Sequence, residues 1–207
     1  MKRLGLICTS LLVLLAGCAA PPVVKTDMSK FEAAKPRSIL VVPATNKSVE
    51  VDAPNYLLTT LTVPLAEKGF YVFPVHTAKT VLEQEGLYEG EQIHKQPPEQ
   101  LAKLFGADAV LYVTINQWDA KYVVLSTTVT VDFDYRLVGK DGTELWRANK
   151  RMQYTPQNNN GLLGAAIAAA IERAKPNYIP LTQMANNDVF VYGPTAIPNG
   201  PYSAKVQ

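Results

Sequence analysis

Cysteine and histidine are scarce in this sequence, which has two of each among 207 residues. Cys8 and Cys18 both lie near the amino terminus, so the rest of the chain can form no disulfide and depends on its core for stability. His76 and His94 lie far apart in the sequence and away from both cysteines. Because zinc sites need several ligands at short spacing, the sequence predicts no metal site and no cofactor.

A clear excess of charge is also missing. The chain has 20 basic and 18 acidic residues, which gives a formal charge of +2. Lys2 and Arg3 account for this difference, so a chain that begins at Cys18 has no net side-chain charge. Binding of nucleic acid needs a basic excess and is therefore not expected.

Motifs that support catalysis are absent from the sequence as well. We find no nucleophile elbow, no glycine-rich phosphate loop and no His–carboxylate motif. Four polar side chains that recur on one predicted strand face could be imagined as catalytic, but such a row is usually a solvated surface; they are Ser126, Thr128, Asp132 and Asp134. The sequence therefore predicts a protein that is not an enzyme.

The amino terminus, in contrast, carries a clear export signal. Lys2 and Arg3 precede an apolar run over residues 4–16, which is too short to span a bilayer because a spanning helix needs about 20 residues. The run ends in Leu15-Ala16-Gly17-Cys18, which resembles the lipobox of bacterial lipoproteins. An ordinary cleaved signal followed by a chance cysteine is the alternative.

The lipobox resemblance implies a covalent lipid anchor. In such lipoproteins the signal, here residues 1–17, is cut before the cysteine, and the thiol and new amine of Cys18 carry acyl chains. Several acyl chains hold a protein stably on a membrane. Ala19 follows the cysteine in place of Asp, which implies sorting to the outer membrane. We expect a lipid-anchored protein there, on the periplasmic side more than on the cell surface.

The exported chain is predicted to contain one domain. Residues 18–37 are expected to form the lipidated cysteine and a tether, in which Pro21 and Pro22 favour an extended start and Phe31 is the one large group able to dock. Residues 38–192 are expected to form the globular α/β domain. Residues 193–207 are expected to form a proline-rich extended tail.

The first part of this domain alternates between strands and helices. Apolar runs predict strands over residues 38–43, 70–75 and 109–118, and the third is expected to be central. Residues at helical spacing predict helices between Asp52 and Gly69 and over residues 77–85 and 99–105. The order β-α-β-α-β indicates right-handed crossovers and a partly parallel sheet.

The second part of the domain alternates between apolar and polar residues. Over residues 121–137 this pattern predicts one strand with a buried face and a wet face. The expected buried positions are Val123, Leu125, Val129, Val131, Phe133 and Tyr135, and the wet row also includes Thr130 and Arg136. A turn at 139–142 and a return strand over 143–154 complete a hairpin. With helices over 161–171 and 180–187, the predicted fold class is α/β (α+β), with a single mixed sheet, β-α-β-α-β, followed by an antiparallel hairpin and C-terminal helices.

Two registers of the hairpin keep its buried face. One pairs Val138 with Thr143 and sets Asp134 opposite Arg147, whereas a shorter Asp-Gly turn sets Arg136 opposite the same arginine. Opposite charges across two strands stabilise and like charges destabilise, each by up to about 1 kcal/mol. We therefore predict the first register, although an Asp-Gly pair favours the shorter turn.

The segment 161–171 is apolar on all sides and must be buried if it is helical. It is expected to be a core helix that lies on the sheet. The alternative is that its small residues form a flat strip for a partner, because small side chains let two backbones approach closely; they are Gly161, Gly164, Ala165 and Ala168.

Several blocks of the sequence together resemble a family of Gram-negative lipoproteins of unknown function; they are residues 36–43, 64–75, 97–101, 105–112 and 161–171. One departure is Pro43-Ala44-Thr45-Asn46, where the family has Pro-Pro-x-Asn. This family is similar in fold to the N-terminal domain of the Tol-system propeller protein, to the lipoprotein activator of a penicillin-binding protein and to the curli-secretion pore lipoprotein. The resemblance implies a pore-type lipoprotein as partner, and it supplies no catalytic residues.

Two functions remain open from the sequence. The first is a non-enzymatic outer-membrane lipoprotein that acts as an accessory or scaffolding subunit of an envelope complex, possibly one for secretion or transport, through a protein partner or self-association. The second is a periplasmic carrier of a small apolar ligand, which needs an apolar pocket of roughly 300 Å³ or more. A cell-wall hydrolase is disfavoured because no paired acid and base is evident.

Overall fold

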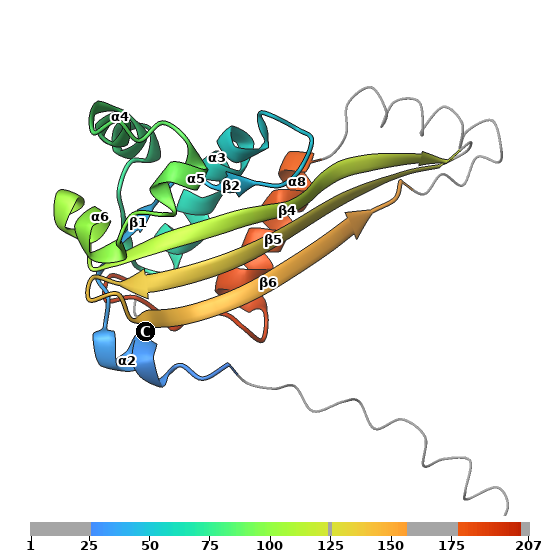
Figure 1. Cartoon of the computed structure of the whole chain (residues 1–207). Helices are drawn as coiled ribbons and strands as arrows, with labels where there is room; N and C mark the ends of the chain where they lie inside the picture. The colour runs from blue at the N-terminus through green and yellow to red at the C-terminus, as the bar shows by residue number, and fades with distance from the viewer. Residues whose placement is uncertain (1–25, 124–125, 157–177, 204–207) are drawn as a thin grey trace, which may run out of the picture.

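A mixed sheet of six strands forms the centre of the computed structural model, which describes residues 26–123, 126–156 and 178–203 (Figure 1). The strands lie in the order β3-β1-β4-β5-β6, and β2 pairs with β4 on the edge that β1 also uses. The predicted α/β class with one mixed sheet is confirmed. The strands are β1 (Ser38–Val41), β2 (Thr45–Asn46), β3 (Tyr71–Val72), β4 (Ala109–Val123), β5 (Ser126–Gly139) and β6 (Glu144–Tyr154).

The parallel half of the sheet follows the prediction closely. β1 pairs in parallel with both β3 and β4, and Ile39 lies between Val72 and Ala109. β4 is the central strand, as the sequence predicts, because it pairs with β1 and β2 on one side and with β5 on the other. The strand predicted over 70–75 is shorter, since only Tyr71–Val72 pair as β3 and Val75 already begins a helix.

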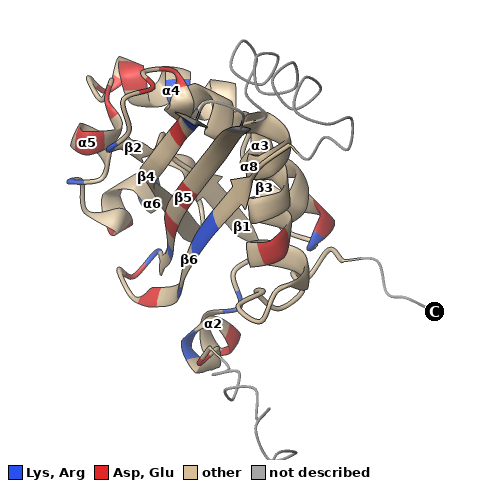
Figure 2. Ribbon diagram, turned by 90° about the vertical axis from the view of Figure 1, so that its right-hand side faces the viewer, with Lys and Arg blue, Asp and Glu red and all other residues tan. Residues whose placement is uncertain are grey.

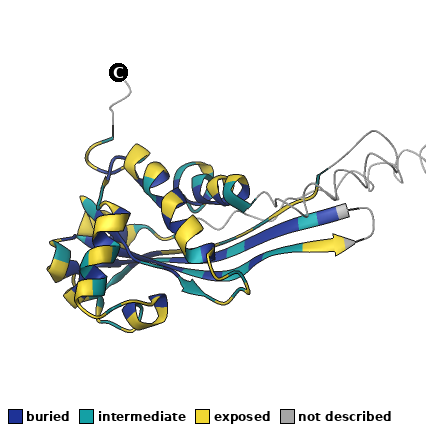
Figure 3. Ribbon diagram, turned by 90° about the horizontal axis from the view of Figure 1, so that it is seen from above, coloured by how far each residue is buried: buried dark blue, intermediate teal, exposed yellow. Residues whose placement is uncertain are grey.

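Helices cover both faces of this half, and Figure 3 shows the sheet edge-on among them. One face packs against α3 (Ala53–Glu67) and α8 (Tyr178–Asn187), which the π-helix η1 (Asp188–Tyr192) continues. The other face packs against α4 (Val75–Gln84), α5 (Gly90–Ile93) and α6 (Pro98–Phe105). β1 is buried from both sides, which explains why its sequence is continuously apolar.

The antiparallel half extends beyond the helices as a long hairpin (Figures 1 and 3). β4 ends at Val123 and β5 begins at Ser126, so the prediction of one strand over 121–137 is wrong. The sequence between them contains no Gly, Pro, Asn or Asp, so no residue type marks a turn. A bulge between Ile115 and Gln117 keeps Ile115 and Trp118 in the same core.

The predicted register of β5 and β6 is also wrong. Val138 pairs with Glu144 rather than with Thr143, because residues 140–142 form the loop and Gly142 has a φ of 81°. A second shift beside Leu145 then sets Arg136 opposite Arg147. This bulge lets two consecutive apolar side chains, Leu145 and Trp146, enter the same core, and that burial outweighs the unfavourable pairing of two arginines.

Both ends of the described chain are attached to the body. Within the segment predicted as a tether, residues Ser29–Ala34 form α2, whose Phe31 is 4% exposed and meets Phe70 edge-on at 6.0 Å. At the other end, the backbone of the proline-rich segment crosses Gly69. There the Gly200 N–H donates to the Lys68 carbonyl at 2.7 Å and the Tyr202 N–H donates to the Gly69 carbonyl at 3.0 Å.

A buried polar chain links the sheet to α3 and α8. The Tyr135 hydroxyl donates to Asn186 Oδ1 at 2.7 Å, and Asn186 Nδ2 donates to Thr60 Oγ1 at 2.9 Å. The Thr60 hydroxyl in turn donates to the Leu57 carbonyl at 2.7 Å. Because each of these groups has a partner, the core can hold them without the cost of an unsatisfied polar atom.

Candidate functional site

The predicted anchor and the predicted partner strip lie outside the described residues. Cys18 and the small residues Gly161, Gly164, Ala165 and Ala168 therefore stay predictions. In the part of the chain that the structure does describe, no helix is both long enough and apolar enough to cross a membrane. The described surface offers instead a polar cleft, an apolar hollow and an uncovered half of the sheet.

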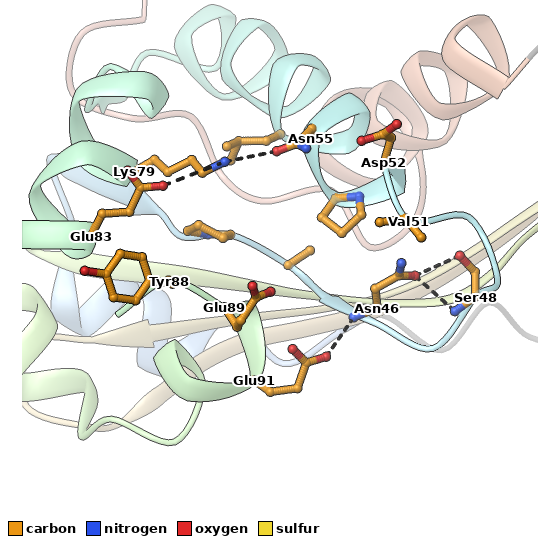
Figure 4. Close-up of a pocket in the computed structure, with 15 residues that line it drawn as sticks. Asn46, Ser48, Val51, Asp52, Asn55, Lys79, Glu83, Tyr88, Glu89 and Glu91 are labelled. Carbon is orange, nitrogen blue, oxygen red and sulfur yellow. Dashed lines mark hydrogen bonds and ion pairs between the residues drawn. The ribbon is translucent and has the colours of Figure 1, made fainter. Parts of the chain in front are cut away.

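The polar cleft, of about 520 Å³, lies where β2, the start of α3, α4 and α5 meet (Figure 4). Lys79 Nζ lies 3.3 Å from Asn55 Oδ1 and 4.0 Å from Glu83 Oε1. Across the cleft, the Asn46 N–H donates to Glu91 Oε1 at 3.3 Å. The acidic side chains of the lining are Asp52, Glu83, Glu89 and Glu91.

Two of these acidic side chains, Glu89 and Glu91, form hydrogen bonds that hold the walls of the cleft in place. Glu89 and Gln92 form a capping box at the start of α5, which fixes one wall. Gly90 lies so close to the opposite wall that a Cβ there would be 2.2 Å from the Ala44 carbonyl oxygen. With four carboxylates and one lysine, the cleft suits a cationic or polar group and does not fit an apolar ligand.

The apolar hollow, of about 330 Å³, lies between α2 and the C-terminal segment. Its lining includes Phe31, Pro36, Phe70, Pro198 and Pro201. Its volume reaches the lower end of the range for small-molecule sites, roughly 300 Å³. This hollow is one feature that fits the carrier hypothesis.

The uncovered half of the sheet is the part of the α4–α6 face, on β4, β5 and β6, that lies beyond these helices and that no described helix covers. Figure 2 shows that acidic and basic residues occur on neighbouring strands of the sheet. A hollow of about 270 Å³ opens on this face beside α5. Its lining includes His94, Tyr112, Thr114, Asp134, Arg136 and Arg147.

Asp134 is held on this face by two side-chain amides. Its Oδ2 accepts a hydrogen bond from Asn116 Nδ2 at 2.7 Å, and its Oδ1 accepts one from Asn149 Nδ2 at 2.9 Å. Partial burial acts to raise the pKa of Asp134, but the two hydrogen bonds, together with Lys47 and Arg147, lower it below its ordinary value. Asp134 is therefore an ionised carboxylate with both oxygens occupied, which does not suit a general acid.

The wet row that the sequence predicts on β5 is thus largely structural. Asn149 Nδ2 also donates to Asp132 Oδ1 at 3.0 Å, and Thr128 Oγ1 and Thr155 Oγ1 lie 2.9 Å apart. Thr130 departs from the prediction, because it is 2% exposed and accepts a hydrogen bond from Gln153. None of the described side chains of this row forms an acid–base pair.

The two histidines do not meet. His76 is exposed in the first turn of α4, whereas His94 is half-buried after α5 with its Nε2 3.1 Å from the Pro43 carbonyl oxygen. Over residues 26–123, 126–156 and 178–203, no three His, Cys, Asp or Glu side chains lie close enough together to hold a metal ion. The described residues therefore offer no ligand set that could be tested for a metal.

The free energy of unfolding is expected to fall as the pH drops from 6.5 toward 4. Burial, aided by Arg136, lowers the pKa of His94 from 6.5 to about 4, despite the Pro43 carbonyl and Glu91. Between these values the unfolded chain binds a proton that the folded domain does not, so acid favours unfolding by up to about 1 kcal/mol per pH unit. Urea unfolding measured between pH 7 and pH 5 tests this.

The second histidine supplies the control for this measurement. His94→Gln should reduce the change in the free energy of unfolding between pH 7 and pH 5, a range in which carboxylates contribute little. His76→Gln should leave this change as it is in the wild-type protein. Equal slopes in the wild-type protein and the His94→Gln variant would show that this imidazole is not the group that responds.

Sequence reasoning found only part of the uncovered face. Alternation identified Asp132, Asp134 and Arg136 as a wet row on one strand. It missed Thr114 and Asn149, because these residues join the row only through pairing with β4 and β6. The register that brings them together depends on bulges, which leave no clear pattern in the sequence.

Comparison with known proteins identifies the family. Residues 26–187 match the family described as "Putative lipoprotein GNA1162-like". A lipoprotein of Neisseria meningitidis serogroup B, NMB1124/NMB1162, is 37% identical over 161 residues, which cover 77% of this chain and 75% of that protein. This coverage is sufficient to show shared family membership.

One solved structure agrees with this assignment. The crystal structure of lipoprotein GNA1162 from Neisseria meningitidis has 36% identity and a TM-score of 0.57, with 67% of this chain and 98% of that chain covered. The LpoB C-terminal domain from Salmonella enterica has 19% identity and a TM-score of 0.40, with 70% and 92% covered. The resemblance to a lipoprotein family is thus confirmed, and the chain belongs to the GNA1162-like lipoproteins.

Proposed function

We propose that this protein is a non-enzymatic lipoprotein, held at the periplasmic side of the outer membrane by acyl chains on Cys18, that docks a protein partner of the cell envelope. The observation that carries the proposal is the uncovered face of β4, β5 and β6 in a member of a lipoprotein family. Hydrogen bonds between neighbouring strands hold its charged side chains in place, and an ordered charged surface favours recognition of a partner.

The organisation of the domain supports docking more than catalysis. Asp134 and Asp132 are bound by side-chain amides, and Arg147 is bound by Glu144. A rigid, charged and solvated face gives electrostatic complementarity to a partner at little cost in ordering. A hydrolytic site would need a nucleophile beside a base in a closed cleft, which this face does not provide.

Metabolic labelling with an alkyne analogue of palmitate tests the anchor. Wild-type protein should be labelled and should stay with outer-membrane vesicles through a high-salt wash, because several acyl chains make dissociation negligible. Cys18→Ser should lose the label, and Cys8→Ser should keep it because that cysteine leaves with the signal. Equal labelling of both variants would contradict an anchor at Cys18.

Chemical cross-linking in intact envelopes tests the docking function. Wild-type protein should give a discrete adduct whose second component is identified by mass spectrometry, either another envelope protein or a second copy of this chain. Absence of any adduct under several linkers, with the wild-type protein anchored and folded, would contradict a partner.

The apolar hollow between α2 and the C-terminal segment favours a second function, that of a carrier for a small apolar ligand. Protein purified from envelopes would then release a lipid or a similar molecule into organic solvent, and Phe31→Ser would release less of it. Purified protein that releases nothing above the level of a control lipoprotein would remove this second function.

A further inference from the structure

Two arginines face each other across the uncovered half of the sheet. The register of β5 and β6 sets Arg136 directly opposite Arg147, a pairing that destabilises two antiparallel strands. Arg147 is neutralised by Glu144, with Nε 3.0 Å from Oε1 and Nη2 2.8 Å from Oε2. Arg136 forms no such ion pair: among the described residues, Glu144 acts on it only at longer range, and no carboxylate lies within ion-pair distance of its guanidinium.

An aromatic ring holds the Arg136 guanidinium in place. Its Cζ lies 4.7 Å from the centroid of the Tyr112 ring, to which it is paired across β4 and β5. Tyr112 is 2% exposed, and His94 supports it edge-on at 5.0 Å. A guanidinium that stacks through its face keeps its N–H groups free at its edge. Arg136 is therefore a half-buried, preorganised cation whose donors no described side chain uses.

The hollow beside Arg136 is large enough to admit a side chain. Its volume of about 270 Å³ falls below the range for sites that enclose a whole small molecule, roughly 300–1,000 Å³. Thr114 adds a second donor, because its Oγ1 accepts a hydrogen bond from Thr45 at 2.9 Å and keeps its own proton. Asp134 already has both oxygens bonded to amides.

We propose that this hollow receives an Asp or Glu side chain of the protein partner, with its carboxylate bound by Arg136 and Thr114. The inference rests on the proposed docking function and names the chemistry of its central contact. The planar fork of an arginine matches a carboxylate through two parallel hydrogen bonds. A phosphate group fits less well, because its second negative charge would meet the ionised Asp134 in the same hollow.

Site-specific photo-cross-linking of the full chain in intact cells tests this inference. A photoreactive amino acid replaces Lys95, which is exposed beside His94, and in a second strain it replaces Glu67, which is exposed on the α3 side of the sheet. The position at Lys95 should give an adduct with the partner. Arg136→Gln should reduce the yield of that adduct by about tenfold, the effect of losing one strong contact at an interface.

Arg151→Gln is the matched control, because Arg151 lies on the same face and its nearest carboxylate is that of Asp132 at 3.7 Å. It should leave the adduct unchanged. Arg136→Lys keeps the charge but loses the planar guanidinium with its paired donors, so it should give only part of the wild-type yield of adduct. Thermal unfolding of the purified variants checks that each one folds.

The results separate this inference from the proposed function. An adduct that Arg136→Gln leaves at full yield, or whose partner segment contains no Asp or Glu, overturns the carboxylate contact but keeps the docking function. An adduct from Glu67 alone places the partner elsewhere and also overturns it. No adduct from any position overturns both.

Discussion

Replacing Asn186 with alanine should lower the free energy of unfolding by about 3 kcal/mol, because the change removes two buried hydrogen bonds and orphans a hydroxyl. Asn186 joins Tyr135 at 2.7 Å and Thr60 at 2.9 Å, and neither Asn186 nor Tyr135 is exposed to solvent. In the variant the Tyr135 hydroxyl would face an apolar core without a partner. Urea unfolding followed by tryptophan fluorescence measures the loss.

A neighbour on the same helix provides the control. Asn187→Ala changes the same residue type at a half-buried position and should stay within about 0.5 kcal/mol of the wild type. Tyr135→Phe should cost less in the Asn186→Ala background than in the wild type, because it then removes a hydroxyl that has no partner. Strictly additive effects of the two changes would show that these side chains are not coupled.

Replacing Gly69 with alanine should also cost about 3 kcal/mol, through backbone strain and a clash with the C-terminal segment. Gly69 has a φ of 87°, and a Cβ there would lie 2.0 Å from Ser203 N and 2.5 Å from Ser203 Cα. The segment would have to lift away and would lose its two backbone hydrogen bonds at Lys68 and Gly69. Thermal unfolding of the purified variant measures the effect.

Gly86→Ala is the control that separates the steric clash from the backbone strain. Its φ is 79°, close to that of Gly69, but no atom lies within 4 Å of the Cβ that alanine would add. Gly86→Ala should therefore cost only the backbone strain, about 1 kcal/mol. If both glycine variants lose the same stability, the contact between Gly69 and the C-terminal segment contributes nothing measurable.

Local patterns in the sequence predicted the parallel half of the sheet well. The run around Ile39 has to be a strand buried on both faces, and α6 and α8 follow the predicted helices to within two residues at each end. β2 and α5 were not predicted, because two and four residues are too few to show a period. The separation of β4 from β5 was missed because the sequence around Val123 is typical of strands.

The candidate site depended on information that the sequence does not show. Cross-strand charge alone favours Asp134 opposite Arg147, yet the burial of both Leu145 and Trp146 decides the register. The result places Arg136 in a preformed hollow, and no described carboxylate forms an ion pair with it. Where a local electrostatic rule fails in this way, the position is a good candidate for recognition, because its cost can be offset when a partner binds.

Contacts between the C-terminal segment and the body determine when the domain can complete its folding. Arg37, just before the first strand, holds the Tyr202 hydroxyl at 2.9 Å, and Trp146 Nε1 donates to the Thr195 carbonyl at 2.8 Å. A chain delivered through a translocation channel amino terminus first cannot make these contacts until Thr195 and Tyr202 have emerged. The lipid anchor proposed at Cys18 lies far upstream of these contacts. The anchored end would then reach the membrane before the body has folded, and chaperones of that compartment would meet a protein that is anchored but incomplete.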